Sequence, residues 1–189
     1  MQSRNMIRIV LATAFLLLLP WVAMQFSDQV KWGPADFVMA GALLMGTGFT
    51  YELVAKKGGT FAYRAAVGVA LITALLLVWI NLAVGIIGDE DNPANLMYLG
   101  VLVVGLIGTA VARLEKRGMA RALFSMALVQ AMVPVIALKV WTPSAPSGAS
   151  SWGSAGVAGV FGLNAVFVLL FAGSALLFRR ADARATGLA

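Results

Sequence analysis

The sequence contains no cysteine and no histidine, and each absence removes a class of chemistry. Without cysteine the chain forms no disulfide bond and has no thiolate nucleophile. Without histidine it lacks the commonest metal ligand and general base, together with histidine-ligated haem. It also contains no G-x-S-x-G motif and no phosphate-binding glycine loop followed by lysine. These absences predict a protein that is not an enzyme, has no catalytic residue and uses no cofactor.

Charge is scarce as well. Only 12% of the 189 residues are charged, whereas 61% are hydrophobic. A soluble domain carries roughly a quarter charged residues, and one this apolar would expose large patches that associate non-specifically. The composition therefore predicts an integral membrane protein, with the lipid bilayer as its principal partner.

Six apolar runs are long enough to cross the hydrocarbon core, which takes about 20 residues of helix. They lie at 7–26, 35–55, 65–87, 96–112, 120–141 and 157–178. The first run is longer than the core of a cleaved signal peptide and no small-x-small site follows it, so we interpret it as a retained span. The sequence predicts an all-α fold in which residues 1–189 form a single domain of six transmembrane helices.

The basic residues are distributed unevenly among the connections. If the N-terminus is cytoplasmic, only Lys31 and Lys139 fall on the outer side. The inner side then holds Arg4, Arg8, Lys56, Lys57, Arg64, Arg113, Lys116, Arg117, Arg121, Arg179, Arg180 and Arg184. This asymmetry follows the positive-inside rule and predicts a bacterial inner-membrane protein with both termini cytoplasmic. We expect the basic residues behind the net charge of +6 to contact anionic lipid headgroups. A nucleic-acid site is not expected, because these residues are split among short segments.

The connections on the cytoplasmic side are short, so we expect consecutive helices to pack as three antiparallel hairpins. A shift of 59 residues places Pro34 on Pro93 and Gly41 on Gly100. Such matches favour a parallel repeat of a two-helix unit, an arrangement found in transporter folds. A chain rich in Gly, Ala and Leu also produces matches by chance, so both interpretations stay open.

A short polar loop separates the third run from the fourth. Gly85 and Gly88 suit the end of a helix because glycine tolerates a left-handed backbone. Asn92 is a favoured N-cap residue, and Pro93 suits the first position of the helix that follows. These residues predict a solvated turn with a capped helix on its far side.

The same loop contains the only acidic cluster of the chain, formed by Asp89, Glu90 and Asp91. Carboxylates are ligands for divalent cations, and the amides of Asn92 and Asn95 would add further oxygen atoms. The spacing of an EF-hand is absent, however. We therefore predict no metal site and keep the three acidic residues as weak candidates for one.

The segment 81–121 contains this loop and the basic turn that follows the fourth run. It resembles a stretch of small multi-pass bacterial inner-membrane proteins whose activity is not assigned. The segment covers about a fifth of the chain. The resemblance implies a location in the inner membrane and implies no activity.

Polar side chains within the spans are candidates for ligand binding because they are costly in hydrocarbon. Gln130 lies near the middle of the fifth run. Pro134, four residues later, has no N–H to donate to the Gln130 backbone carbonyl, so this carbonyl lacks its helical hydrogen bond. We expect the Gln130 amide to face the interior of the bundle, with Asn81, Asn164 and Thr73 as partners. Gln130, Asn81 and Asn164 would then line a cavity. The alternative is that Gln130 only joins helices by hydrogen bonds.

Glu52 is the only acidic residue well inside a predicted span, and Lys56 follows it by four residues. This spacing favours an ion pair on one helix face. A ligand-binding role for Glu52 is the other interpretation. Asp36 occupies the first turn after Pro34, where the helix dipole favours an acid.

Glycine recurs every third residue at Gly153, Gly156, Gly159 and Gly162. Small residues allow the close approach of a second helix, and the same holds for Gly41 and Gly46 of the second run and for Gly100, Gly105 and Gly108 of the fourth. We expect these glycines to mediate helix packing.

Two functions are compatible with these features. One is a small transport protein, or a solute- or lipid-binding protein, with a polar cavity. The other is an accessory or assembly subunit that packs through its glycine-rich faces against a second copy or another membrane protein. Coupled ion transport usually requires a carboxylate at mid-membrane, and none is present, which favours a weakly polar ligand or none.

Overall fold

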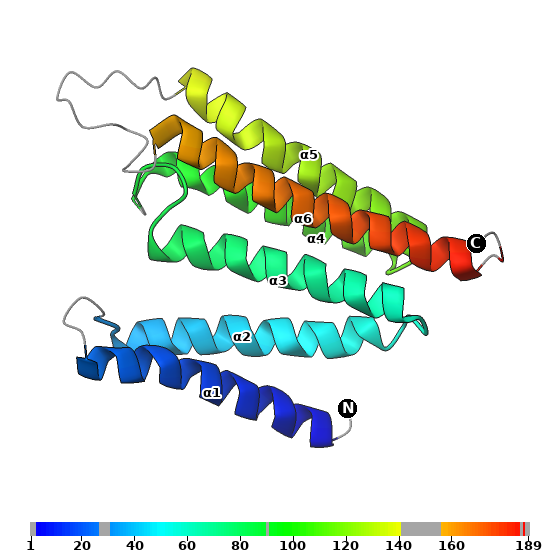
Figure 1. Cartoon of the computed structure of the whole chain (residues 1–189), viewed down its shortest axis with the longest axis horizontal. Helices are drawn as coiled ribbons and strands as arrows, with labels where there is room; N and C mark the ends of the chain where they lie inside the picture. Colours follow the sequence, from blue (N-terminus) through cyan, green and yellow to red (C-terminus); the bar gives the residue numbers. More distant parts are fainter. Residues whose placement is uncertain (1–2, 27–30, 90, 141–155, 186, 188–189) are drawn as a thin grey trace. The chain divides into compact units, whose positions relative to one another are not determined.

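The computed structural model describes residues 3–26, 31–89, 91–140, 156–185 and 187, and these residues form helices joined by turns (Figure 1). The elements are α1 (Ser3–Phe26), α2 (Pro34–Ala55), α3 (Phe61–Ala83), the 3-10 helix η1 (Pro93–Leu96), α4 (Met97–Ala112), α5 (Lys116–Val140) and α6 (Gly156–Ala185). No strand occurs within these ranges, which confirms the predicted all-α class.

Six helices are long and apolar enough to cross a membrane, the fourth being η1 together with α4. This confirms the number and order of the predicted spans. The third run was predicted to end at residue 87, but α3 ends at Ala83. The difference arises because Ile86 and Ile87 are buried in a turn and do not continue the helix. An apolar run indicates that its side chains are buried, and buried side chains occur in loops as well as in helices.

The chain forms two compact units, Met1–Lys56 and Lys57–Ala189. In the first unit α1 packs against α2. A methyl group added to Gly48 would come within 2.8 Å of the Ile9 Cγ2 atom, so the two helices approach closely at this point. Near the same end of the unit, the Asn5 amide donates to Glu52 Oε1 across 2.5 Å.

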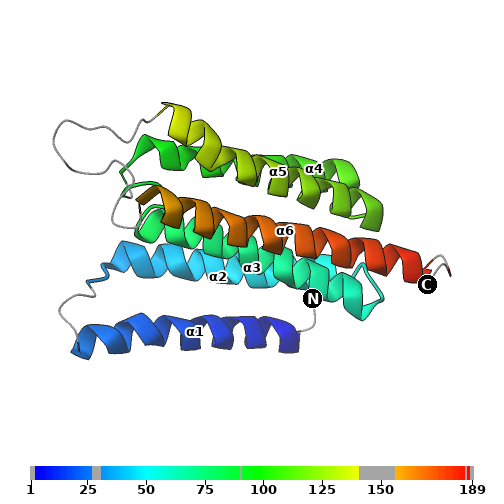
Figure 2. The same ribbon diagram turned by 45° about the horizontal axis from the view of Figure 1, so that its top comes forward.

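In the second unit α6 packs against both α3 and α5, and α4 packs against α5 (Figure 2). The main neighbours of α3 and α4 are therefore α6 and α5, although the two helices are consecutive in the chain. This differs from the expected hairpin of the third and fourth helices. The polar loop between α3 and α4 crosses the end of the bundle, so the two helices pack against different neighbours.

Aromatic side chains fix one end of this unit. The rings of Tyr63 and Phe178 meet edge to face with centroids 5.1 Å apart, and this contact joins α3 to α6. The Tyr63 hydroxyl donates across 3.1 Å to the backbone carbonyl of Leu114, in the turn between α4 and α5. Arg113 and Leu114 have left-handed backbones, with φ of 47° and 63°. Such conformations are costly for residues with a Cβ, and the Tyr63 bond stabilises the turn.

Small residues allow α4 and α5 to approach closely. A Cβ atom on Gly108 would lie 2.6 Å from the Ala122 Cβ, and one on Gly118 would lie 2.7 Å from the Ala112 Cβ. A Cβ on Gly105 would likewise meet the Met126 sulfur at 2.5 Å. The packing role predicted for Gly105 and Gly108 is confirmed. The same prediction is wrong for Gly46 and Gly100 within their own units, because no described heavy atom lies within 4 Å of a Cβ built on either, and Gly41 meets only the Leu17 side chain at 3.5 Å.

The glycines at the start of α6 behave differently. Gly153 lies outside the described residues, and no heavy atom approaches within 4 Å of a Cβ built on Gly156 or Gly162. The buried face of α6 contains Val160 and Asn164, and Gly162 lies about 200° around the helix from each of them. The prediction that Gly162 mediates close packing is therefore wrong within this unit.

The turn between α3 and η1 follows the predicted pattern. Gly85 and Gly88 have φ of 69° and 76°, the left-handed conformation expected for glycine at a helix end. Asn92 is the N-cap of η1, and its side chain accepts from the Ala94 N–H across 2.9 Å. Pro93 begins the 3-10 helix, as predicted.

The side chain of Asn95 organises this turn from within. Its Oδ1 atom accepts from the backbone N–H groups of Ile86 and Ile87 at 3.1 and 2.9 Å. Its Nδ2 atom donates to the carbonyls of Ile87 and Asp89 at 3.2 and 2.6 Å. All of these bonds replace bonds to water for a buried stretch of backbone. Asn95 therefore has a structural partner for each side-chain atom that the metal interpretation would have used.

Candidate functional site

A buried chain of polar side chains joins three helices of the second unit. The Gln130 Nε2 atom on α5 donates across 2.8 Å to Asn164 Oδ1 on α6. The Asn164 Nδ2 atom donates in turn to the Tyr98 hydroxyl on α4 and to the Val160 carbonyl, each at 2.8 Å. The exposed fractions of Gln130, Asn164 and Tyr98 are 0%, 1% and 2%. The predicted inward orientation of Gln130 and its pairing with Asn164 are confirmed.

Sequence reasoning missed Tyr98 as a member of this chain. It lies at the start of the fourth run, where an aromatic residue is expected at the membrane interface without any buried role. A signal was present in the spacing, because Tyr98, Val101, Gly105 and Ala112 lie on one side of the helix and are all buried. That face could have been recognised by its small and aromatic residues at helical spacing.

The other expected partners of Gln130 have different contacts. Thr73 donates to the Val69 carbonyl at 2.7 Å, and the Asn81 amide donates to the Leu77 carbonyl at 3.1 Å. Both bonds run within α3 and join no other helix. The Asn81 Oδ1 atom is buried without a hydrogen-bond partner among the described residues. The hydrogen bonds bring Gln130 and Asn164 together and do not connect Asn81 or Thr73 to them.

The buried chain has the properties of an interhelical link. Hydrogen bonds between membrane helices are worth about 0.6 kcal/mol each on average, so the chain contributes modestly to stability and strongly to the rotation of each helix. Amides and a phenol in this setting offer no general base near neutral pH. The Gln130 Oε1 atom is buried without a partner among the described residues. It is the single acceptor of the Gln130 side chain left for a further polar group.

Glu52 forms the ion pair that its spacing predicts. Its Oε1 atom lies 2.6 Å from Lys56 Nζ and also accepts from the Asn5 amide. The side chain of Glu52 is 15% exposed, whereas that of Lys56 is 49% exposed. The charge of Glu52 is thus matched within its own unit, and its ligand-binding role stays a prediction. Of the weak metal candidates, Glu90 lies outside the described residues.

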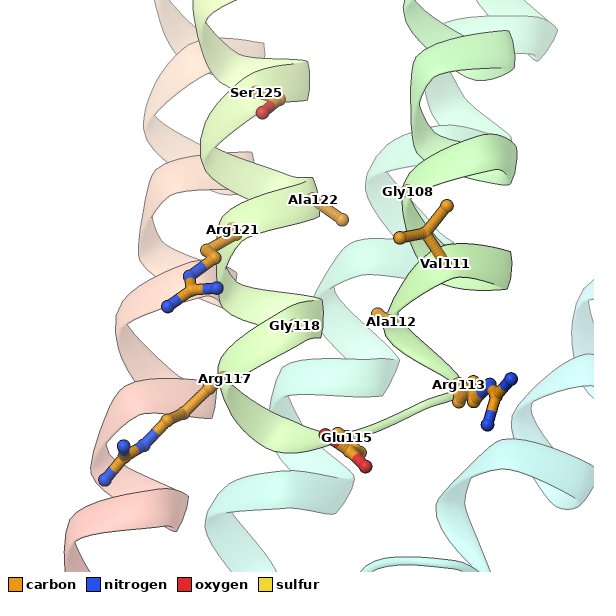
Figure 3. A pocket seen from close by; sticks show the side chains of 10 residues that line it. All are labelled: Gly108, Val111, Ala112, Arg113, Glu115, Arg117, Gly118, Arg121, Ala122 and Ser125. Carbon is orange, nitrogen blue, oxygen red and sulfur yellow. The ribbon is translucent and has the colours of Figure 1, made fainter.

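A hollow lies elsewhere, between the end of α4 and the start of α5 (Figure 3). We name it the α4–α5 groove, and its volume is about 640 Å³. It is lined by Gly108, Val111, Ala112, Arg113, Glu115, Arg117, Gly118, Arg121, Ala122 and Ser125. Figure 3 shows the small residues facing one another between the two helices and the charged residues around the turn below them.

The local sequence explains this shape. Close packing at Gly108 and Ala122 brings the backbones together, and the short side chains there leave a shallow apolar surface over the contact. Where α4 ends, Arg113 extends away on one side of the groove, and Arg117 and Arg121 extend towards α6 on the other (Figure 3). All three arginines are exposed. The groove is therefore apolar along its length and positively charged at one end.

A second hollow of about 470 Å³ adjoins the groove on the α6 side of α5, and we name it the α5–α6 hollow. Arg117 and Arg121 line both cavities. The Arg117 Nε atom donates to Asp182 Oδ2 on α6 across 2.6 Å. A third hollow of about 480 Å³ also touches Arg117 and Asp182, beside Lys57, Tyr63 and Leu114 and next to Glu115 and Lys116. Arg117 thus lies where three cavities meet.

In the sequence these arginines belong to the basic residues predicted to face the cytoplasm, and nothing there marks them as a site. The spacing of Arg117 and Arg121 by one helical turn, close to small residues at Gly118 and Ala122, was the available signal. The contribution of α6 through Arg179 and Asp182 had no signal in the local sequence.

Comparison of the chain with known proteins identifies no family. The chain matches no protein-family model, no curated protein and no solved structure.

Proposed function

We propose that the chain is a multi-pass protein of the bacterial inner membrane that binds anionic phospholipid and catalyses no reaction. The six apolar helices support the membrane location. The orientation, with the N-terminus cytoplasmic, rests on the positive-inside rule. In this orientation the turn between α4 and α5 and the last turns of α6 meet the cytoplasmic leaflet, whose anionic lipids attract basic segments.

The α4–α5 groove carries the proposal. Its arginines present guanidinium groups, which bind phosphate oxygens through paired hydrogen bonds. Its small and apolar residues continue from the charged end along the helices, where an acyl chain would run. A headgroup at Arg113 and Arg121 and a chain over Gly108 and Ala122 would match this polarity. Basic pockets between membrane helices on the cytoplasmic side are typical sites for anionic headgroups.

We favour lipid binding over solute transport because of the state of the buried polar chain. Gln130 donates to Asn164 and Asn164 donates to Tyr98, and all three side chains are buried. A transport pathway would require these groups to exchange their partners for a solute. The groove, in contrast, is open and already carries unsatisfied charge.

The test compares two pairs of arginines that have the same charge. The double variant Arg113→Gln and Arg121→Gln removes charge from the groove, whereas Arg4→Gln and Arg8→Gln removes it from α1. Binding of phosphatidylglycerol to the purified protein is measured by native mass spectrometry, with phosphatidylcholine as the neutral reference lipid. We expect the groove variant to lose about tenfold in affinity, a change of ~1.4 kcal/mol, and the α1 variant to retain it. Equal losses in both variants would mean diffuse attraction to charge and would overturn the proposal.

An accessory or assembly role is the second candidate. It is favoured by the open face of α6 around Gly162, where no described heavy atom lies within 4 Å of a built Cβ. A helix of a second copy or of another membrane protein could approach closely at this face. Cross-linking from a cysteine placed at Val166, which is exposed and lies one turn after Gly162, would detect such a neighbour in intact membranes, because the chain contains no cysteine of its own. Absence of any cross-linked species would count against this role.

A further inference from the structure

We infer that the preferred lipid carries two phosphate groups, as a diphosphatidylglycerol of the cardiolipin type does. One phosphate would occupy the α4–α5 groove and the other the α5–α6 hollow. The inference rests on the proposed lipid-binding function and adds the class of headgroup.

The shared arginines are the first reason. Arg117 and Arg121 are one turn apart on α5, a rise of about 6 Å, and both line the groove and the hollow. They form a ridge of two guanidinium groups between the cavities. Arg113 lies only on the groove side of this ridge, and Arg179 lies only on the hollow side. Each cavity therefore has three arginines, two of them in common.

The balance of charge is the second reason. The two cavities together are lined by four positive and two negative side chains, which are Arg113, Arg117, Arg121, Arg179, Glu115 and Asp182. Their net charge is +2. A lipid with one phosphodiester would neutralise half of this charge, whereas two phosphodiesters would neutralise it completely. Like charges held close together favour the ligand that removes their repulsion.

The ion pair between α5 and α6 is the third reason. Arg117 is 69% exposed and Asp182 is 25% exposed, so the pair lies at the surface between the two cavities. The bond uses the Nε–H of Arg117, which leaves its four Nη–H donors outside this interaction. Asp182 thus holds the guanidinium on the ridge, and less side-chain entropy is lost when phosphate binds. Gly118, in the first turn of α5, also lines the groove, and the first N–H groups of a helix have no carbonyl partner within that helix.

The experiment titrates the full chain in mild detergent with three probes. These are tetra-acyl cardiolipin, phosphatidylglycerol and sodium pyrophosphate, and native mass spectrometry counts the bound molecules. We expect one cardiolipin per chain, bound about tenfold more tightly than phosphatidylglycerol, with no displacement by millimolar pyrophosphate. The acyl chains would pack over the small apolar residues of the α4–α5 groove, and this contact accounts for the expected difference in affinity between the lipid and free diphosphate.

Each other outcome has a separate meaning. Equal affinity for both lipids would overturn the inference and leave the lipid-binding function intact. Binding of neither lipid would overturn both. Displacement of cardiolipin by pyrophosphate at equal concentration would assign the site to a soluble diphosphate and overturn the inference that its ligand is a lipid.

Single variants at exposed positions test the placement of the two phosphates. Arg179→Gln should weaken cardiolipin about tenfold and leave phosphatidylglycerol in the groove unaffected, whereas Arg113→Gln should weaken both lipids. Arg64→Gln is the matched control, because Arg64 is an exposed arginine of α3 that lines neither cavity. If Arg179→Gln weakens both lipids equally, or neither, the second phosphate does not lie in the α5–α6 hollow and the inference fails.

Discussion

The side-chain amide of Gln130 lies 2.8 Å from the Asn164 amide oxygen and joins α5 to α6 where neither residue meets solvent or lipid. An unpaired amide in hydrocarbon costs several kcal/mol on the alkane-transfer scale of about 4–8 kcal/mol. The pair therefore fixes how each helix is rotated about its own axis. The α4–α5 groove lies nearer the start of α5 and is lined by neither Gln130 nor Asn164.

Replacement of Gln130 by Leu tests whether this pair is a link between helices or part of a binding site. A link predicts a loss of ~1 kcal/mol in stability and unchanged lipid affinity. Thermal unfolding in detergent and lipid titration measure the two quantities. Leu128→Met, at a largely exposed position on the same helix, is the control. A variant that unfolds as the parent does but no longer binds lipid would assign Gln130 to the site.

Replacement of Asn95 by Ala should be among the more damaging changes in the α3–η1 turn. It leaves the buried N–H groups of Ile86 and Ile87 without an acceptor, at a cost of about 2 kcal/mol or more. Asn92→Ala removes the capping bond to the Ala94 N–H and should cost ~1 kcal/mol. Denaturation of both variants in the same detergent compares them directly. Equal losses would mean that Asn95 does not organise the turn.

The acidic loop should not bind a structural metal. The triple variant Asp89→Asn, Glu90→Asn and Asp91→Asn should unfold at the same temperature as the parent, with or without millimolar calcium. The physical reason is that Asn92 Oδ1 already accepts from the Ala94 N–H, and Asn95 already has backbone partners for both of its polar atoms. A calcium-dependent rise in the melting temperature of the parent that disappears in the variant would establish a cation site.

Two glycine substitutions should have opposite effects. Gly108→Ala places a methyl group 2.6 Å from the Ala122 Cβ, so α4 and α5 must separate, at a cost of about 1–3 kcal/mol. Gly162→Ala meets no atom within 4 Å and should stabilise α6 by about 0.5–1 kcal/mol, because alanine is the better helix former. Thermal unfolding of the two variants checks the signs. A destabilising Gly162→Ala would reveal a neighbour on the open face of α6.

The topology is tested with reporter fusions. Fusions after Arg64, Asp91, Arg117, Ser147 and Ala189 should report in, out, in, out and in. The positive-inside rule gives this order, since twelve of the 14 basic residues then face the cytoplasm. Two reversed signals would exclude the proposed orientation and would move the arginine groove to the outer face.

The sequence by itself determined the features that depend on solvent and on neighbouring residues. Apolar runs gave the number and order of the helices, because a helix in hydrocarbon must satisfy its backbone internally. Gly85 and Asn92 gave the ends of the turn through local backbone preferences. The pair of Glu52 and Lys56 followed from their spacing along one helix. Gln130 had to face inward because its amide needs a polar partner.

Only the tertiary structure decided which helix faces meet. In a soluble protein the polar face of a helix shows which side is buried, but a membrane helix is apolar on its lipid side and on its packed side alike. The sequence therefore left the rotation of α4 open, and with it the role of Tyr98 beside Asn164. For the same reason, Arg117 and Asp182, 65 residues apart, could be recognised as partners only when α5 and α6 were seen side by side.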